Sequence, residues 1–215
     1  MPKSLQKYCR LFTLSVSAIA LNMSMAGTKV KAELFNSALD RLPAQERVAL
    51  RQGQSLVTGS NGKYTGRVLV KATVATAWQV LTDYNNFYRF LPNIASSKLI
   101  QNNGDRKIFE QVQVIRVFVL TKKARVRLAI KETYPKQIAF SLVEGNLKSL
   151  QGAWRIEPIS PYPGAPPNQV LIVHQVNAEP GAISTRSLFY SIYKDNLENS
   201  LVALKREVER RSLKK

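Results

Sequence analysis

The chain has 215 residues, of which 45% are hydrophobic and 21% charged, a composition typical of a folded globular protein rather than a disordered or disulfide-rich one. Lysine and arginine outnumber aspartate and glutamate by 32 to 14, and a net charge of +18 favours anionic partners such as acidic lipid surfaces or nucleic acid. One cysteine and one histidine are too few for an intramolecular disulfide or a cysteine/histidine zinc site, so we expect no metal and no cofactor.

Residues 1–32 are predicted to be an export signal. Three basic residues and no acidic ones precede a mostly apolar stretch over 11–26, and small residues before Gly27 and Glu33 offer two cleavage sites. The alternative is an uncleaved N-terminal membrane anchor, for which the apolar stretch is short. We therefore predict an exported protein that remains strongly basic after cleavage.

The next segment, residues 33–63, is predicted to be an N-terminal extension with a helix and a turn. Apolar positions within 33–56 favour the helix. Residues 58–63 form a turn-rich cluster, in which Gly59 and Gly62 are typical of a hairpin or entry turn.

Alternation over residues 64–72 predicts a first strand, and two short helices are predicted to follow it over 74–83 and 84–91. Asp83 lies between these helices and is expected to cap the second one. The chain is then strand-like with turns at the spacing of an antiparallel meander, and its predicted strands cover 96–101, 107–120, 124–134, 137–143, 147–158 and 170–176. Lys122 and Lys123 are expected to mark one of the turns.

A long amphipathic helix is predicted over residues 187–211, because apolar residues recur there at spacings of three and four. An antiparallel sheet has one face to cover, and a single long helix packed across a curved sheet can leave a cavity between them.

Several segments carry a family resemblance. They are residues 74–84 (VATAWQVLTDY), 90–92 (FLP), 140–145 (FSLVEG) and 152–154 (GAW), followed by the C-terminal helix. Together they resemble the START/Bet v 1-like (SRPBCC) superfamily, and most closely its cyclase/dehydrase and coenzyme Q-binding-protein START branch. The resemblance covers residues 64–211 and leaves a basic tail at 212–215.

The resemblance implies an α+β helix-grip fold, in which a curved antiparallel sheet wraps around the long C-terminal helix and two short helices follow the first strand. It also implies a lipid, quinone or polyketide-like ligand in the cavity. The basic exported form and the segment LPAQERVALRQG resemble a cyanobacterial-type subgroup, which implies the periplasm or the thylakoid lumen as location.

Candidate catalytic residues are few: Glu110, His174 and Tyr190. No nucleophile–histidine–acid pattern or phosphate-binding glycine loop accompanies them, and a packed or solvated role is the simpler interpretation of each. Glu110 lies in a strand with apolar residues at both parities, so it is either an internal acid with a raised pKa or an external partner of the basic strand nearby. Two of these candidates facing one pocket would favour an enzyme.

Six residues are expected to contact a ligand near the cavity mouth, although core packing also explains each one: Phe87, Phe90, Leu91, Phe189, Tyr190 and Tyr193.

Arg125, Arg127 and Lys131 lie at alternate positions opposite an apolar face, and this basic stripe predicts either a docking surface for anionic membrane or a solvated strand face. No aromatic residues interleave with it, so nucleic acid is not expected as a partner.

We therefore predict a protein that binds a hydrophobic small molecule, such as a lipid or quinone-like isoprenoid, without catalysis. Transfer of the bound molecule is an extension of this prediction. One alternative is a cyclase/dehydratase-like enzyme that uses general acid–base chemistry. The other is a protein-interaction module with a basic face, which a pocket smaller than about 300 Å³ would favour.

Overall fold

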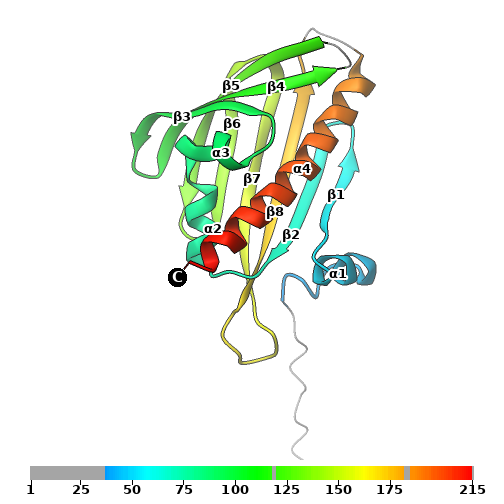
Figure 1. Cartoon of the computed structure of the whole chain (residues 1–215), viewed down its shortest axis with the longest axis vertical. Coiled ribbons are helices and arrows are strands. Elements are labelled where there is room, and N and C mark those ends of the chain that lie inside the picture. The colour runs from blue at the N-terminus through cyan, green and yellow to red at the C-terminus, as the bar shows by residue number, and fades with distance from the viewer. Residues whose placement is uncertain (1–36, 118–119, 182–184, 215) are drawn as a thin grey trace, which may run out of the picture. The chain divides into compact units, whose positions relative to one another are not determined.

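Strands dominate the described chain and form one curved antiparallel sheet that holds a long helix on its concave face (Figure 1). The computed structural model describes residues 37–117, 120–181 and 185–214, so the predicted signal peptide lies outside the described residues. The helical elements are α1 Ala44–Arg51, α2 Val74–Leu81, the 3-10 helix η1 Tyr84–Asn86, α3 Phe87–Phe90 and α4 Arg186–Ser212. The strands are β1 Ser55–Ser60, β2 Lys63–Val70, β3 Ile94–Asn103, β4 Arg106–Val117, β5 Leu120–Thr133, β6 Gln137–Gly145, β7 Leu147–Ile159 and β8 Gln169–Pro180.

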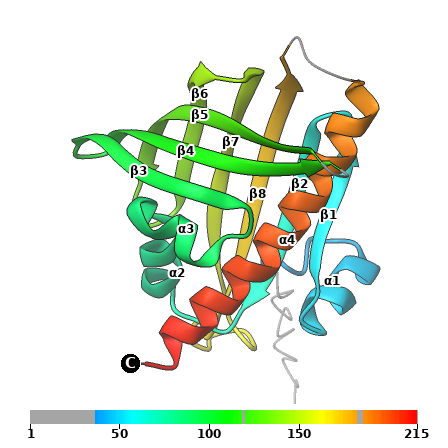
Figure 2. The same cartoon turned by 45° about the horizontal axis from the view of Figure 1, so that its top comes forward.

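The sheet order is β1-β2-β8-β7-β6-β5-β4-β3, with antiparallel pairing between all neighbours. Helix α4 crosses the concave face and packs on β1 and β2, while α2 packs on α4 and β7 (Figure 2). Helix α3 lies beside β3 and the C-terminal part of α4. This arrangement confirms the predicted helix-grip fold and the long C-terminal helix.

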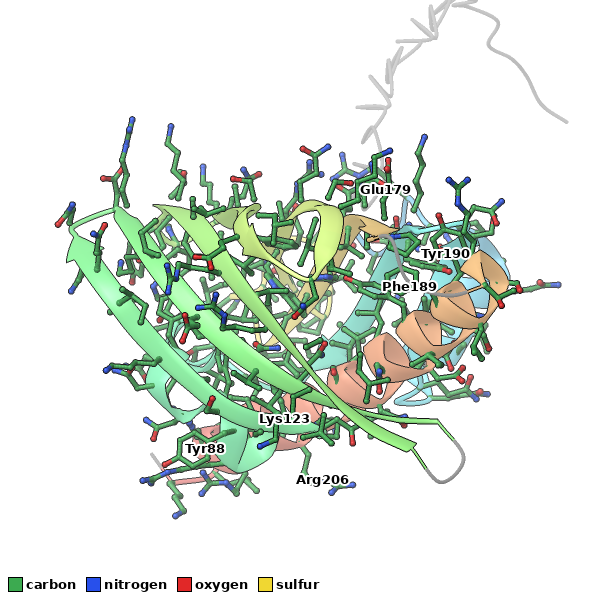
Figure 3. All side chains as sticks on the ribbon, turned by 90° about the horizontal axis from the view of Figure 1, so that it is seen from above. Tyr88, Lys123, Glu179, Phe189, Tyr190 and Arg206 are labelled. Carbon is green, nitrogen blue, oxygen red and sulfur yellow. The ribbon has the colours of Figure 1, made fainter. Side chains whose placement is uncertain are left out.

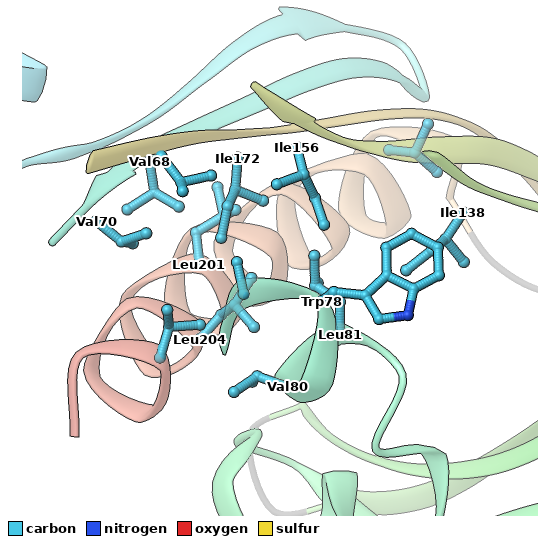
Figure 4. Packing of buried hydrophobic residues seen from close by; sticks show 14 of the residues in the cluster. Val68, Val70, Trp78, Val80, Leu81, Ile138, Ile156, Ile172, Leu201 and Leu204 are labelled. Atoms are coloured by element: carbon cyan, nitrogen blue, oxygen red, sulfur yellow. The ribbon is translucent and has the colours of Figure 1, made fainter. Parts of the chain in front are cut away.

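The main core lies between α4 and the β2–β8–β7 part of the sheet (Figure 4). Leu201 of α4 is fully buried and faces Gly66 of β2, where an added Cβ would lie 2.7 Å from the Leu201 Cδ1 atom. The glycine therefore allows the helix to approach the strand closely. Val68 and Ile172, from neighbouring strands, complete this part of the core and are likewise fully buried.

A second, smaller core lies on the other face of the sheet. Leu39 and Leu50, from the segment around α1, cover Leu69 of β2 and Leu171 of β8, and all four side chains are buried. The N-terminal segment therefore shields the convex face at the end of the sheet where α4 packs on the concave face.

The predicted secondary structure of residues 33–63 needed correction. The prediction of helix up to residue 56 was wrong, because α1 ends at Arg51 and β1 begins at Ser55, where it pairs with β2. Asn61 and Gly62 both have positive φ and connect Ser60 to Lys63, which confirms the hairpin. Asn-Gly tolerates this left-handed backbone and matches the twist of the two strands.

The turn predicted at Lys122 and Lys123 was also wrong. Both residues lie within β5 and pair with Ile115 and Val114 of β4. Lysines are common at turns, but they are also common on exposed strand positions, so their presence alone did not mark the end of a strand. No helix in the described part of the chain is both long and apolar enough to cross a membrane.

Candidate ligand-binding cavity

A cavity of about 200 Å³ lies between α4, the η1–α3 segment and the concave face of β4–β8. Most of its walls are aliphatic and aromatic, as expected for a site that binds small apolar molecules. No aspartate, glutamate, lysine or arginine of the described residues lines it. Its polar side chains are all uncharged groups: Tyr84, Gln111, Gln113, His174, Tyr193, Asn196 and Ser200.

One wall of the cavity is aromatic and comes from the η1–α3 segment. Phe87 makes edge contacts with Phe90 and Phe109, at ring-centre distances of 5.7 and 5.4 Å. Tyr84 packs edge-on against Phe87, and Leu91 completes this wall at the end of α3. The predicted ligand-contact residues Phe87, Phe90 and Leu91 therefore all line the cavity.

Polar contacts hold this aromatic wall in place. The Tyr84 hydroxyl donates a 2.6 Å hydrogen bond to Glu132, which also pairs with Lys107. Burial, together with this acceptor, raises the pKa of the Tyr84 hydroxyl, so the phenol stays protonated. At the other end of the wall, the Asn93 side-chain amide donates to Asn196 of α4 at 3.0 Å.

Asp83 ties the same segment to the end of α4. It stands at the expected capping position, but its side chain makes no capping hydrogen bond. Its carboxylate instead accepts from the Asn86 side chain and from Arg211, the latter at 2.7 Å. The Arg211 guanidinium also lies 5.7 Å from the centre of the Phe90 ring. The capping prediction for Asp83 was therefore wrong, because a stronger charged partner is available from α4.

His174 projects from β8 into the cavity lining and is only 6% exposed. Its ring packs against two aromatic side chains, with ring-centre distances of 3.7 Å to Trp154 and 5.6 Å to Phe140. The Nδ1 atom is buried without a hydrogen-bond partner among the described residues. Burial lowers the pKa of the imidazole from 6.5 to about 3, so His174 is neutral at physiological pH.

The aromatic residues of α4 separate into two groups. Tyr193 lines the cavity and stacks on Tyr64, and burial raises the pKa of its hydroxyl. Phe189 packs beside Tyr193 without lining the cavity. Tyr190 lies outside the lining as well, close to Gly62 at the β1–β2 turn, and its backbone oxygen accepts a hydrogen bond from the Tyr64 hydroxyl.

These positions correct the expectation of a shared mouth. Phe189 and Tyr190 lie in the first turns of α4, whereas Tyr88 of α3 lies near the opposite end of the helix (Figure 3). The sequence places the two groups on a short helix and on the long C-terminal helix, but only the packing of α3 on the C-terminal half of α4 decides how far apart they lie.

Glu110 is on the convex face, outside the cavity. It accepts hydrogen bonds from Arg127 at 2.8 Å and from Arg125 at 3.2 Å, and both arginines also pair with Glu144. The hydrogen bond from Arg127 is the main reason that the pKa of Glu110 is lowered. Of the two predicted environments for Glu110, the structure therefore has the external, ion-paired one.

The predicted basic stripe is thus partly balanced by acidic side chains. Arg125 and Arg127 share two carboxylates, and this group of four residues is hereafter called the convex charge cluster. Lys131 is exposed and has no ion-pair partner in the described ranges.

Five polar lining residues were not predicted from the sequence: Tyr84, Gln111, Gln113, Asn196 and Ser200. Asn196 and Ser200 follow Tyr193 at spacings of three and four residues, so they lie on the same face of α4 as Tyr193. The helical period could therefore have predicted them as lining residues. Gln111 and Gln113 share the parity of buried Phe109, but apolar residues at both parities of β4 hid that signal.

The cavity volume limits what can enter. An apolar cavity of about 150 Å³ accommodates a benzene ring, so the volume observed here suits one ring or a short branched chain rather than a whole lipid. Among the described residues, no three histidine, cysteine, aspartate or glutamate side chains are grouped as a metal site would require.

Residues 70–201, more than half of the chain, match the family described as polyketide cyclase / dehydrase and lipid transport. The chain therefore belongs to this family. No curated protein matches the sequence.

Solved structures from other organisms show the same fold. A protein from Thermus thermophilus is 18% identical, with a TM-score of 0.59 over 69% of this chain and 97% of its own. The STAR-related lipid transfer protein of Xanthomonas axonopodis is 18% identical, with a TM-score of 0.56 over 71% and 89%. The Zhui aromatase/cyclase of Streptomyces sp. R1128 is 14% identical, with a TM-score of 0.53 over 70% and 92%.

Proposed function

We propose that this protein binds an uncharged hydrophobic small molecule, or the ring-bearing end of a larger one such as a quinone-like isoprenoid, without transforming it. The observation that carries the proposal is the cavity beneath α4, whose described lining is aromatic and aliphatic and contains no ionised side chain. Each methylene group transferred from water into such a site contributes about 0.8 kcal/mol to binding. The lipid-transfer relative from Xanthomonas axonopodis supports the same function.

The alternative of an acid–base cyclase is supported by the aromatase/cyclase relative and by His174 in the cavity wall. Such catalysis needs a proton donor or acceptor with a suitable pKa near the substrate. Of the three predicted candidates, only His174 lines the cavity, and its lowered pKa makes it a weak base. The geometry therefore favours binding over this chemistry.

The alternative of a protein-interaction module is favoured by the cavity volume of about 200 Å³, which is below the 300 Å³ typical of ligand pockets. A protein-interaction module of this kind also needs a basic face. In the convex charge cluster, two of the three predicted basic residues are paired with acidic side chains, which weakens this alternative. The binding function therefore remains our proposal, with a single ring as the part that enters.

Ligand content and uptake test the binding proposal. Native mass spectrometry of the protein purified from its own membranes is expected to show one small molecule per chain. Naphthalene, an uncharged fluorescent probe, should bind the stripped protein but not the variant Leu128→Trp, which fills the cavity from β5. Val143→Trp, on the exposed side of β6, is the matched control and should bind normally. Absence of both bound molecule and probe uptake would contradict the proposal and favour the interaction module.

We also propose that the protein is exported and docks on anionic membrane, which would bring it to a membrane-dissolved ligand. The signal-like residues 1–32 and the positive net charge support this. Each basic residue near an anionic surface contributes roughly 1 kcal/mol. Arg125→Glu with Arg127→Glu should therefore weaken binding to anionic vesicles by more than about tenfold at low salt.

Two results would contradict export and docking separately. N-terminal sequencing of the protein from its source is expected to begin at Gly27 or Glu33, and an intact start in a soluble cytoplasmic fraction would contradict export. Equal co-sedimentation with neutral and anionic vesicles would contradict docking and leave the cavity function standing.

A further inference from the structure

A trough runs across the convex face of the sheet, on the side opposite the cavity. Two hollows of about 580 and 490 Å³ form it, and both are lined by Phe140 and Ser141 of β6, where they meet. The first hollow extends from β6 to Thr58 of β1, and the second extends from β6 to Gln101 of β3. The trough therefore crosses the whole sheet, and the functions proposed above make no use of it.

The pairing of the strands explains the hollow shape. Where β5, β6 and β7 run side by side, the floor consists of four small side chains: Ala129, Ala139, Ser141 and Ala153. Ala129 alternates with the cavity-lining Leu128 and Ile130 along β5, so this floor faces away from the cavity. Arg127 of β5 and Arg155 of β7 point to the same face, each two residues from the floor, and bound it on opposite sides.

Cations stand near both ends of the trough. Arg106 of β4 and Lys131 of β5 are direct cross-strand partners in the second hollow, and Lys63 of β2 lines the first. Like charges directly opposite each other destabilise a pair of strands. Within the described ranges, none of the three cations has an ion-pair partner, and no aspartate or glutamate lines either hollow. A partner with negative charge would relieve this repulsion.

The distance between the two cationic ends suits an extended peptide. Neighbouring strands lie about 4.8 Å apart, so the steps from Lys131 on β5 across β6, β7 and β8 to Lys63 on β2 span about 19 Å, or about six residues of extended chain. Gln151 and Gln175 lie between these ends, and their side-chain amides form no hydrogen bond to another described residue. An amide group both donates and accepts hydrogen bonds, as a peptide main chain does.

We infer that the trough binds an extended acidic segment of a partner protein. Its acidic side chains reach the cations at both ends, while its main chain meets the amides between them. The unpaired cations, a described lining without carboxylates and a hollow of matching length carry this inference. Because the trough and the cavity lie on opposite faces of the sheet, the inference goes beyond the proposed ligand-binding function and does not depend on it.

Two other occupants fit these observations less well. A lipid bilayer presents a flat surface, which would meet the arginines beside the trough and leave the alanine floor uncovered. A second copy of this chain would bring the same cations to the contact, and the net charge of +18 would oppose its association.

Two fluorescent peptides of equal composition test the spacing of the cations. One has two glutamates at each end of five serines, and the other has all four glutamates at one end. Fluorescence anisotropy with the full chain at low salt should show the first peptide binding at least about threefold more tightly, because only this peptide can pair with both cationic ends.

The cationic pair is tested by the double variant Arg106→Gln with Lys131→Gln. It should weaken binding of the first peptide by about fivefold, as expected for the loss of two exposed ion pairs, and should abolish the preference between the peptides. Since the two cations repel each other, thermal denaturation should show a variant at least as stable as wild type. Arg206→Gln with Lys214→Gln is the matched control, because it removes the same charge from exposed positions on and after α4 and should preserve the preference.

Three results would overturn the inference. Equal affinity for the two peptides, or an equal loss in the control variant, would mean that only net charge attracts them. Equal weakening of anionic-vesicle binding and peptide binding by the Arg106/Lys131 variant would assign the surface to a membrane. A dimer in sedimentation velocity that this variant dissociates would assign the trough to a second copy. Naphthalene uptake by the cavity should be the same in all these variants, so the proposed binding function is tested separately.

Discussion

The two faces of the sheet differ in how they use the same strands. On β5, Val126, Leu128 and Ile130 point into the cavity, while the intervening Arg125 and Arg127 join the convex charge cluster. No described residue that lines the cavity on the concave face is ionised, whereas the convex face holds its charges in pairs that are exposed or partly exposed. The comparison teaches that the larger core and the cavity lie on the concave side, whereas the convex side combines a smaller core with charges that are available for contacts with the surroundings.

The largest loss of stability is expected when a buried apolar side chain of α4, on the concave face of the sheet, is truncated. Leu201→Ala removes a fully buried side chain and should lower the free energy of unfolding by about 2–5 kcal/mol. Val202→Ala, at the next residue, changes a side chain that is 47% exposed and should alter stability by less than about 0.5 kcal/mol. Urea denaturation measures both, and similar small losses would show that α4 does not close the core.

A second loss of stability is expected when an extra methyl group is placed in the contact between β2 and Leu201 of α4. In Gly66→Ala the new methyl group meets Leu201, so the variant should be less stable by about 1–3 kcal/mol. In the Leu201→Ala background this cost should largely disappear, because the atom that caused the clash is gone. Additive losses in the double variant would contradict a direct contact between the two positions.

Replacing the buried carboxylate of Glu207 should lower stability by an amount similar to that expected for Gly66→Ala. Glu207 of α4 is buried and accepts hydrogen bonds from Arg210 and Arg211. Glu207→Gln should cost about 1.5–3 kcal/mol, the range for hydrogen bonds to a charged group. Glu198→Gln, which removes an exposed pair with Lys194 on the same helix, should cost less than about 0.5 kcal/mol in the same assay.

The contribution of Glu207 should also depend on pH. Hydrogen bonds, from Arg210 first and then Arg211, lower its pKa from 4.5 to about 2 against the opposing effect of burial. The folded state therefore holds this proton less tightly than the unfolded state, and the stabilisation is present above pH 4.5 and lost as the pH falls toward 2. The stability difference between wild type and Glu207→Gln should shrink over that interval, whereas a constant difference would show that the charge of Glu207 is not responsible.

The smallest effect is expected on the convex face. Arg127→Gln removes two partly exposed ion pairs and should change the free energy of unfolding by less than about 1 kcal/mol. Raising the salt concentration should reduce even this difference, because ions screen exposed charges. A loss as large as that of Leu201→Ala would mean that the convex charge cluster is a structural element of the fold.

Local sequence patterns predicted much of the architecture correctly. Strand alternation and turn residues indicated the long β meander, and the spacing of Leu197, Leu201 and Leu204 indicated the face of the last helix that is buried. The predictions failed where one pattern had two interpretations. The segment before Asn61 lacks a clear period and forms β1, and lysines at 122 and 123 lie in a strand rather than in a turn.

The candidate site was harder to predict, because its residues come from separate strands and helices. Phe87, Phe90, Leu91 and Tyr193 were expected near a ligand and do line the cavity, whereas Phe189 and Tyr190 do not. The packing of α3 against the C-terminal half of α4 decides this difference, and it depends on long-range contacts such as Asp83 with Arg211.

By itself, the sequence determined the order of most elements and the two-faced character of β5, because periods of two and of about 3.6 residues indicate which side chains share a face. The fold class followed from the resemblance to a known family. Only the tertiary structure decided which face of β4 turns inward, since that strand is apolar at both parities. It placed Glu110 outside against two arginines and Gln111 inside the cavity. It also packed His174 against Trp154 and Phe140, where burial, rather than any local motif, lowers the pKa of the imidazole.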